Sequence, residues 1–167
     1  ASPIIIGIRS DGTVLQLQAD GSFIARILVA VRDGGGAIPA EKFELRYKIK
    51  DTDHEYTTVE ASGSDAEIWI SPVEELFDYE IGVRSIGTNG TFSDWVTQYH
   101  AVAGKIAPPQ DISSVVATVR GIEGVEIRWA AVTDVDLDHY ELRVGADWET
   151  GEELFNLDRM LHRGIYS

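Results

Sequence analysis

The stretch from Tyr79 to Trp95 constrains the fold more than any other part of the sequence. An alternating run, Tyr79–Ile86, is followed by Gly87-Thr88-Asn89-Gly90 and then by Phe92-Ser93-Asp94-Trp95. Alternation places Tyr79, Ile81, Val83 and Ile86 near one face of a strand, and Glu80, Arg84 and Ser85 near the other. Asn-Gly between two such runs favours a tight hairpin, because both residues tolerate a positive φ. The stretch therefore predicts a β-hairpin.

Other runs with a strand period precede this hairpin. Phe43–Ile49 alternates apolar with charged residues, which predicts a strand with one buried face. Shorter or more apolar runs are Ile4–Ile8, Val14–Leu17, Phe23–Val31, Tyr56–Val59 and Ala66–Ile70. Gly, Asp and Asn turns separate them. About seven short strands at this spacing predict an antiparallel β-sandwich of about 100 residues.

The pattern stops at Gly104-Lys105-Ile106-Ala107-Pro108-Pro109 and then restarts. Two consecutive prolines favour an extended linker and cannot lie inside a sheet. We therefore expect one domain over 1–104 and a second over 105–167, with strands at 112–119, 124–130 and 138–145. Phe43–Ile49 and Tyr140–Val144 resemble each other, which indicates an internal repeat.

The second domain is expected to be partial, because 105–167 is shorter than a complete sandwich. Its last segment has the pattern of a helix over 151–163: Thr150 and Glu153 fit a capping box, and Leu154, Leu157 and Leu161 share one stripe. The competing interpretation is that this segment is the frayed or irregular end of a longer domain. Missing strands could lie in further sequence or in another chain.

Charge and composition exclude several functions. With 28 acidic against 14 basic residues and a net charge of -14, the chain is a poor partner for nucleic acid or for an anionic membrane. It has no cysteine, so disulfides and thiolate zinc sites are excluded. No apolar run approaches the ~20 residues that span a bilayer. Because the chain starts at Ala1 with a single internal Met160, we expect an excised or processed piece of a longer protein.

The hairpin, the junction at Gly104–Pro109 and the phrases Ile127-Arg128-Trp129 and Asp134–Gly145 resemble the fibronectin type III repeats of tailed-bacteriophage tail-tip proteins. These host-specificity proteins lie at the distal end of the tail. The resemblance covers about Pro3 to Trp148. It departs from the family pattern in the second strand, where Phe23–Val31 has no tryptophan, and in the early end of the second module.

The resemblance implies a non-enzymatic role in tail assembly and host attachment, with no cofactor, in the virion tail. It implies other tail-tip subunits as partners, a homo-oligomer, and a host-surface receptor. End loops usually carry the contacts of such sandwiches. The expected interface residues are Asp33, Gly34, Gly35, Gly36, Thr88 and Asn89, with Trp148 as a further candidate. The alternative is a spacer module of a secreted carbohydrate-active enzyme or adhesin, which would be extracellular or on the cell surface.

Other clusters are weaker as sites. Asp134, Asp136 and Asp138 could offer oxygens to calcium, but the calcium-loop template requires Gly and Glu where His139 and Gly145 stand; an acidic turn is the simpler interpretation. The four histidines are scattered, which predicts surface positions and no metal site. The Gly-x-Ser-x-Gly motif of many serine hydrolases does not occur, and nothing in the sequence fixes the separation of two carboxylates as a glycosidase requires. Tyr79, Trp95 and Trp129 are expected in the core; Trp69 has no clear face, and Trp148 is either exposed or covers an open sheet edge.

Overall fold

The computed structural model describes residues 1–158 and 163–166. The chain divides into two compact units, Ala1–Ala107 and Pro108–Ser167, whereas the sequence pattern places the boundary after residue 104. Among the described residues, regular structure consists of strands and of short 3₁₀ turns at η1 (Gly12–Val14), η2 (Gly104–Ile106) and η3 (Gly121–Glu123). The fold is all-β, as the alternation predicts.

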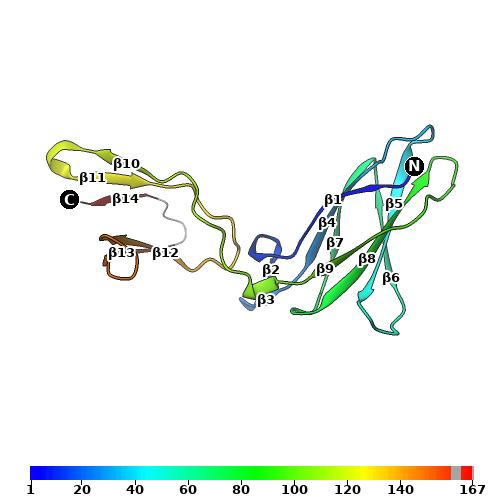
Figure 1. Cartoon of the computed structure of the whole chain (residues 1–167), viewed down its shortest axis with the longest axis horizontal. Coiled ribbons are helices and arrows are strands. Elements are labelled where there is room, and N and C mark those ends of the chain that lie inside the picture. The colour runs from blue at the N-terminus through cyan, green and yellow to red at the C-terminus, as the bar shows by residue number, and fades with distance from the viewer. Residues whose placement is uncertain (159–162, 167) are drawn as a thin grey trace. The chain divides into compact units, whose positions relative to one another are not determined.

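The first unit is a sandwich of two antiparallel sheets (Figure 1). One sheet has the order β1-β4-β7 and the other the order β6-β5-β8-β9, with a small β2-β3 hairpin beside them. The bounds are β1 (Ile4–Arg9), β2 (Gln16–Leu17), β3 (Phe23–Ile24), β4 (Ile27–Arg32), β5 (Ala40–Ile49), β6 (Thr57–Ser62), β7 (Asp65–Ile70), β8 (Asp78–Gly87) and β9 (Val96–Ala101).

The core lies between these sheets and follows the alternation. Phe43 and Leu45 of β5 and Ile81 and Val83 of β8 are 0% exposed, and Leu45 lies opposite Val83 in the ladder. From the facing sheet, β4 and β7 contribute Ile27, Val29, Val31, Ile68 and Ile70, all at most 2% exposed. Burying each such side chain stabilises the fold by about 1.5–3 kcal/mol, which suits a chain without disulfides.

The run Phe23–Val31 forms two strands instead of the single strand expected. The chain breaks between β3 and β4 at Arg26, whose Nε donates to the Val14 carbonyl at 3.0 Å. The same guanidinium stacks on the Trp69 ring at 4.0 Å. Trp69 is 40% exposed and so belongs to the outer face of its sheet, which answers the question left open by its Ile-Trp-Ile context.

The β8–β9 hairpin forms, but its turn differs from the expected Asn-Gly geometry. The Gly87 N–H donates to the Thr91 carbonyl at 2.8 Å, and the Gly90 N–H donates to the Gly87 carbonyl at 2.8 Å. Gly90 has a φ of 78°, whereas Asn89 does not have a positive φ. The tip of the connection is thus a three-residue turn, Thr88 to Gly90, that needs left-handed backbone only at its glycine.

The second unit repeats the first sheet and part of the other. Its strands β10 (Val116–Val119), β11 (Val125–Arg128) and β14 (Arg163–Tyr166) form one sheet, and β12 (His139–Val144) pairs with β13 (Glu152–Asp158). Trp129 and Tyr140 pack edge to face with ring centroids 5.5 Å apart. β10 begins at Val116 and not at 112, because Ser114 has a φ of 52° and interrupts an extended strand.

The helix predicted over 151–163 is wrong for Glu152–Asp158, which form β13; residues 159–162 lie outside the described part of the chain. Asp147 accepts hydrogen bonds from the Thr150 N–H and hydroxyl at 2.8 and 2.7 Å, so Thr150 closes a turn and caps no helix. β12 and β13 then pair antiparallel, with Val144 opposite Glu152 at one end and His139 opposite Asp158 at the other. Tertiary pairing overrides a weak local helix preference.

The junction residues Gly104 and Lys105 are held on the first unit. The Ala103 N–H donates to Ser10 Oγ at 3.1 Å, and the Gly104 N–H donates to the Ser10 carbonyl at 2.6 Å. The Lys105 N–H donates to Glu75 Oε1 at 2.5 Å. Gly104 has a φ of 56°, and a Cβ there would lie 2.4 Å from Glu75 Oε1. The junction therefore requires glycine for both its backbone conformation and its lack of a side chain.

Candidate functional site at the loop end of the first unit

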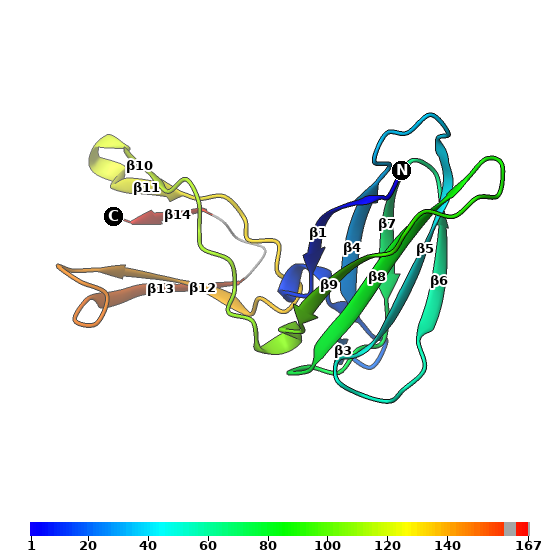
Figure 2. The same ribbon diagram turned by 45° about the vertical axis from the view of Figure 1, so that its right-hand side comes forward.

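Two loops lie side by side at one end of the first unit: the β4–β5 loop, 33–39, and the β8–β9 loop, 88–95 (Figure 2). The Thr88 N–H donates to the Pro39 carbonyl at 3.4 Å. A Cβ on Gly87 would lie 2.9 Å from Cγ2 of Ile38, so the loops touch where Gly87 has no side chain. These are the two loops in which the sequence places the interface.

Asp33 shapes the first loop from within. Its carboxylate accepts from the Gly35 N–H at 3.2 Å and from the Ala40 N–H at 3.0 Å. These backbone donors, Ala40 first, lower the pKa of the Asp33 carboxyl below its ordinary value. The side chain is thus used to close the loop.

The glycines of this loop pack against the first residues of the chain. A Cβ on Gly34 would lie 2.0 Å from the Ser2 carbonyl oxygen, and one on Gly36 would lie 2.9 Å from the Ala1 nitrogen. Gly35 has a φ of 74°. The loop therefore needs glycine for close backbone packing, and not only for the freedom that the sequence suggests.

Thr88 and Asn89 are exposed at the tip of the second loop. Asn89 Oδ1 accepts from the Thr91 N–H at 3.1 Å and from the Thr91 hydroxyl at 2.7 Å. This fixes the tip without covering it, so Thr88 and Asn89 are available to a partner.

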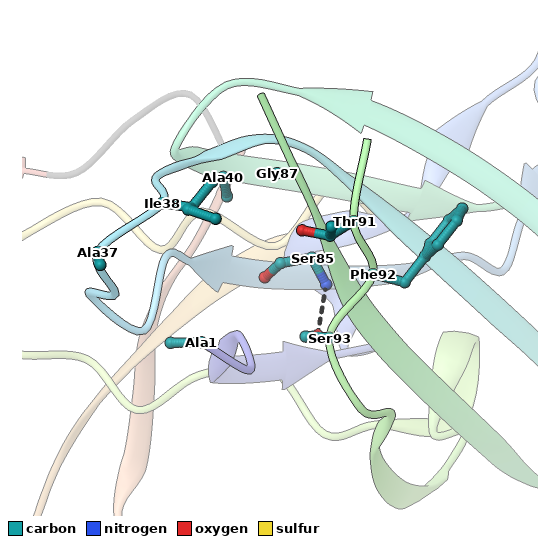
Figure 3. A pocket seen from close by; sticks show the side chains of 9 residues that line it. All are labelled: Ala1, Ala37, Ile38, Ala40, Ser85, Gly87, Thr91, Phe92 and Ser93. Atoms are coloured by element: carbon teal, nitrogen blue, oxygen red, sulfur yellow. Dashed lines mark hydrogen bonds between the residues drawn. The ribbon is translucent and has the colours of Figure 1, made fainter. Parts of the chain in front are cut away.

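A pocket of about 230 Å³ opens between the two loops (Figure 3). It is lined by Ala1, Ala37, Ile38, Ala40, Ser85, Gly87, Thr91, Phe92 and Ser93. In Figure 3 the Phe92 ring points away from the small residues, and the Ser85 oxygen points to the side on which Ile38 and Ala1 lie. The lining therefore combines small apolar side chains with Phe92 and with the hydroxyl-bearing residues Ser85, Thr91 and Ser93.

Ser85 is one of the residues that the sequence analysis misplaced. It was expected on the outer face with Glu80 and Arg84, but it lies opposite Phe43 in the ladder and is 5% exposed. Val83 faces the core, and alternation along β8 places Ser85, two residues later, on the same face. Its N–H donates to Ser93 Oγ at 2.9 Å, whereas its own hydroxyl has no hydrogen-bond partner among the described residues.

The outer face of β5, β8 and the segment before β9 carries stacked cations and rings. The guanidinium groups of Arg46 and Arg84 lie 4.2 and 4.5 Å from the Trp95 ring centroid. A Cβ on Gly82 would lie 3.2 Å from Arg46 Nε. Arg84 Nε also pairs with Glu44 at 2.5 Å. Trp95 therefore lies on this face and not in the core, where the sequence had placed it.

The three aspartates of the second unit do not form a metal site. Asp134 is 6% exposed, and its carboxylate accepts from the Gln110 N–H at 3.2 Å. Asp138 pairs with His139 Nδ1 at 2.8 Å. Within the described residues no group of three His, Cys, Asp or Glu side chains could hold a metal ion, Asp136 included. Asp134 thus acts as a cap for a backbone donor, as turn aspartates commonly do.

Trp148 lies in the β12–β13 turn and is 55% exposed. The Arg143 guanidinium lies 5.0 Å from its ring centroid, and Arg143 Nη1 donates to its carbonyl at 3.2 Å. Of the two placements that the sequence left open, the exposed one is observed.

His100 is paired and half-buried, in contrast to the surface position expected. Its Nε2 lies 2.8 Å from Ser10 Oγ. Burial lowers the pKa of His100 below its ordinary value, while the charge of Asp78 acts in the opposite direction. Ser10 is 3% exposed and its Oγ also accepts from the Ala103 N–H, so this serine holds the junction and is inaccessible as a nucleophile.

No helix of the described residues is long and apolar enough to cross a membrane.

Comparison with known proteins gives a distant structural match. No family model and no curated protein matches the chain. Among solved structures, the FN1–FN3 domains of chicken CNTN1 match at 14% sequence identity and a TM-score of 0.37, over 83% of this chain. The chain spans 48%, about half, of that structure. With one sheet β1-β4-β7 facing another β6-β5-β8-β9, the first unit has the fold of a fibronectin type III β-sandwich.

Proposed function

We propose that this chain is a non-enzymatic structural and recognition segment of a phage or prophage tail tip. In this proposal tandem fibronectin type III units space and orient a loop end that contacts the host surface. Its partners are other tail-tip subunits, including copies of itself, and it resides in the virion tail.

The observation that carries the proposal is the junction. The residues on which the tail-tip resemblance rests are Gly104 and Lys105 with the prolines that follow, and in the structure the first two have defined roles. Gly104 has no room for a side chain, and Lys105 is held by Glu75 through its N–H and at 3.8 Å through its Nζ. A junction sequence that needs a glycine and a lysine at fixed positions is less easily matched by chance than a linker that needs only prolines.

Two further features support a recognition role over catalysis. The loop end presents Thr88 and Asn89 to solvent on a tip fixed by internal hydrogen bonds, and binding surfaces are commonly loops on a rigid scaffold. In the Ser-His contact of the unit, the half-buried His100 meets a buried Ser10 whose Oγ already accepts from the Ala103 N–H of the junction.

Particle labelling tests the proposal. Antibodies against this chain should decorate one end of the tails of particles induced from the strain that carries the gene, as seen by immunogold electron microscopy. Particles from a strain deleted for the gene are the control. Label confined to the cell surface or to a secreted enzyme, with a catalytic domain in the same reading frame, would replace the tail-tip role with the spacer alternative.

A further inference from the structure

β9 is the last strand of its sheet and has one free edge. The order β6-β5-β8-β9 gives it a single neighbour, β8, among the described strands (Figure 2). The ladder between the two runs from Asp78↔Ala101 to Val83↔Val96 without a register shift. The edge strand of a sheet presents unpaired N–H and C=O groups that a further strand can join. β9 is therefore a place where the sheet can be extended.

One hydrogen bond beside the ladder shows which backbone groups of β9 point outward. The Val102 N–H donates to the Phe77 carbonyl at 3.0 Å. Bonding directions alternate along an antiparallel ladder, so the even-numbered residues of β9 bond to β8. The N–H and C=O groups of Thr97 and Tyr99 consequently face away from β8, toward the free edge.

The other three edge strands of the unit, β1, β6 and β7, are each protected against such pairing. β1 has a register shift between Ile5 and Gly7, β6 carries Glu60, and β7 carries Asp65 and Glu67. Bulges and charged side chains are the usual means by which proteins keep an edge unpaired. β9 reads Val-Thr-Gln-Tyr-His-Ala, with no Asp, Glu, Lys, Arg, glycine or proline. Its edge lacks these protections.

The side chains of β9 suit an added ladder. Thr97, Gln98 and Tyr99 are exposed, Tyr99 at 62%. Alternation places Thr97 and Tyr99 on the outer face of the sheet and Gln98 on the opposite face. Threonine and tyrosine are favoured in strands because they pack well on a pleated surface. A strand added at this edge would give both side chains a cross-strand neighbour.

The charge of the chain favours β9 of a second copy as the added strand. At a net charge of -14, two copies repel each other over most of their surfaces. Pairing β7 with β7 would bring Asp65 and Glu67 of both copies together, and like charges opposite each other are destabilising. Pairing β9 with β9 brings together two strands that carry no carboxylate.

One register of this pairing satisfies every outward backbone group. With Thr97 opposite Tyr99 of the second copy, both outward N–H groups of each copy donate to carbonyls of the other. Each such pair sets a β-branched side chain beside an aromatic ring, a favourable cross-strand combination. Gln98 then lies opposite Gln98 of the second copy, on the two-fold axis.

We propose that two copies of this chain pair through β9 in this antiparallel register, which joins their β6-β5-β8-β9 sheets into one continuous sheet. A two-fold contact uses the same surface on both copies and therefore closes at a dimer. The proposal deepens the proposed function and rests on it for the assembly in which copies meet. Because the contact is built on one strand per copy, we expect weak association in solution that strengthens where an assembly holds copies close together.

A single cysteine at the two-fold axis tests the contact. The chain has no cysteine, and directly opposite residues that do not share hydrogen bonds have Cα atoms about 4.5 Å apart, within the reach of a disulfide. With oxidised glutathione, Gln98→Cys should form a disulfide-linked dimer about tenfold or more faster than Thr58→Cys. Thr58→Cys is the matched control, because it places an exposed cysteine on the edge strand β6. Non-reducing electrophoresis measures both rates.

A charge exchange tests the register without oxidation. Gln98→Glu and Gln98→Lys each place like charges opposite each other at the axis. Each variant alone should therefore associate several-fold more weakly than the native chain in sedimentation equilibrium, and an equimolar mixture of the two should recover the association. The same substitutions at Thr58 should leave association unchanged. Both positions are exposed, so the fold tolerates the charges.

Three results would overturn the proposal: equal cross-linking rates at Gln98 and Thr58, a mixture that recovers nothing, or a native chain that stays monomeric up to its solubility limit. Any of these with tail-tip labelling intact would refute the β9 contact and leave the proposed function standing. Pairing through β9 without tail-tip labelling would do the reverse.

Discussion

The two units carry similar strand patterns but bury them to different extents. In the first unit, β5 is paired on both edges, by β6 and β8, and its Leu45 is 0% exposed. In the second, β12 pairs with β13 alone among the described strands, and Leu142 of β12 stays partly exposed. The alternation in each strand specifies which face is apolar. Whether that face becomes dry depends on a neighbouring strand that the alternation cannot supply.

The largest expected effect tests this difference directly. Leu45→Ala should lower the free energy of unfolding of the first unit by about 2–5 kcal/mol, because it leaves a cavity in a closed core. Leu142→Ala should cost the second unit only about 1 kcal/mol, since water already reaches the site. Urea unfolding with hydrogen exchange read by mass spectrometry assigns each loss to its unit; equal losses would break the comparison.

Two glycines with similar backbone conformations, one in each unit, extend the comparison. Gly104 and Gly121 have φ values of 56° and 65°, but a Cβ would collide with Glu75 at the first and meets nothing within 4 Å at the second. Gly121→Ala should cost about 1 kcal/mol from backbone strain. Gly104→Ala should cost about 1–3 kcal/mol more, as measured by thermal or urea unfolding.

The double variant Gly104→Ala with Glu75→Ala isolates the collision. If the steric account is right, the two substitutions together cost less than the sum of their separate effects. Simple additivity would mean that Glu75 has no part in the requirement for glycine at this position.

Much of the fold could be predicted from the sequence because the strands of the first unit follow a period of two. β5 and β8 alternate over long runs, so their pairing faces are readable. The helix predicted over 151–163 failed because its capping pattern considers one segment alone, whereas β13 is fixed by antiparallel pairing with the preceding strand, β12. Local preference is small compared with a ladder of backbone hydrogen bonds.

The candidate site was harder to predict than the strands. The sequence pointed to the two loops, because glycine and asparagine turns mark loop ends. It missed Ser85, because a polar residue was assigned to the wet face by its chemistry and not by its position in the alternation. It also placed Trp95 in the core, because the stacking of Arg46 and Arg84 on its outer-face ring depends on strands that no single run reveals.

A smaller effect concerns the pH dependence of the first unit. Burial lowers the pKa of His100 in the folded chain below its ordinary value of 6.5, so the unfolded chain binds a proton more readily. The contribution of His100 to stability is therefore complete above the unfolded pKa and is lost as the pH falls through it toward the folded pKa. Urea midpoints measured between about pH 8 and about pH 5 should show this loss, and His100→Gln should flatten it. An unchanged slope in the variant would assign the acid sensitivity to other groups.

The smallest effect is expected at the exposed ring of the second unit. Trp148→Ala should change stability by less than about 0.5 kcal/mol, because the side chain is largely in water. Trp129→Ala, at a position 8% exposed, is the matched control and should cost several times more. A large loss at Trp148 would show that its contact with Arg143 orders the β12–β13 turn.

The attachment of the junction to Ser10 and Glu75 has a mechanical consequence. Ser10 follows β1 of one sheet, whereas Ala103 and Gly104 follow β9 of the other, and their hydrogen bonds connect the two sheets at this end. A pulling force that reaches Gly104 along the chain is therefore shared between both layers and does not peel β9 from its edge one bond at a time. A module anchored in this way resists tension along the chain better than one in which the load falls on a single edge strand.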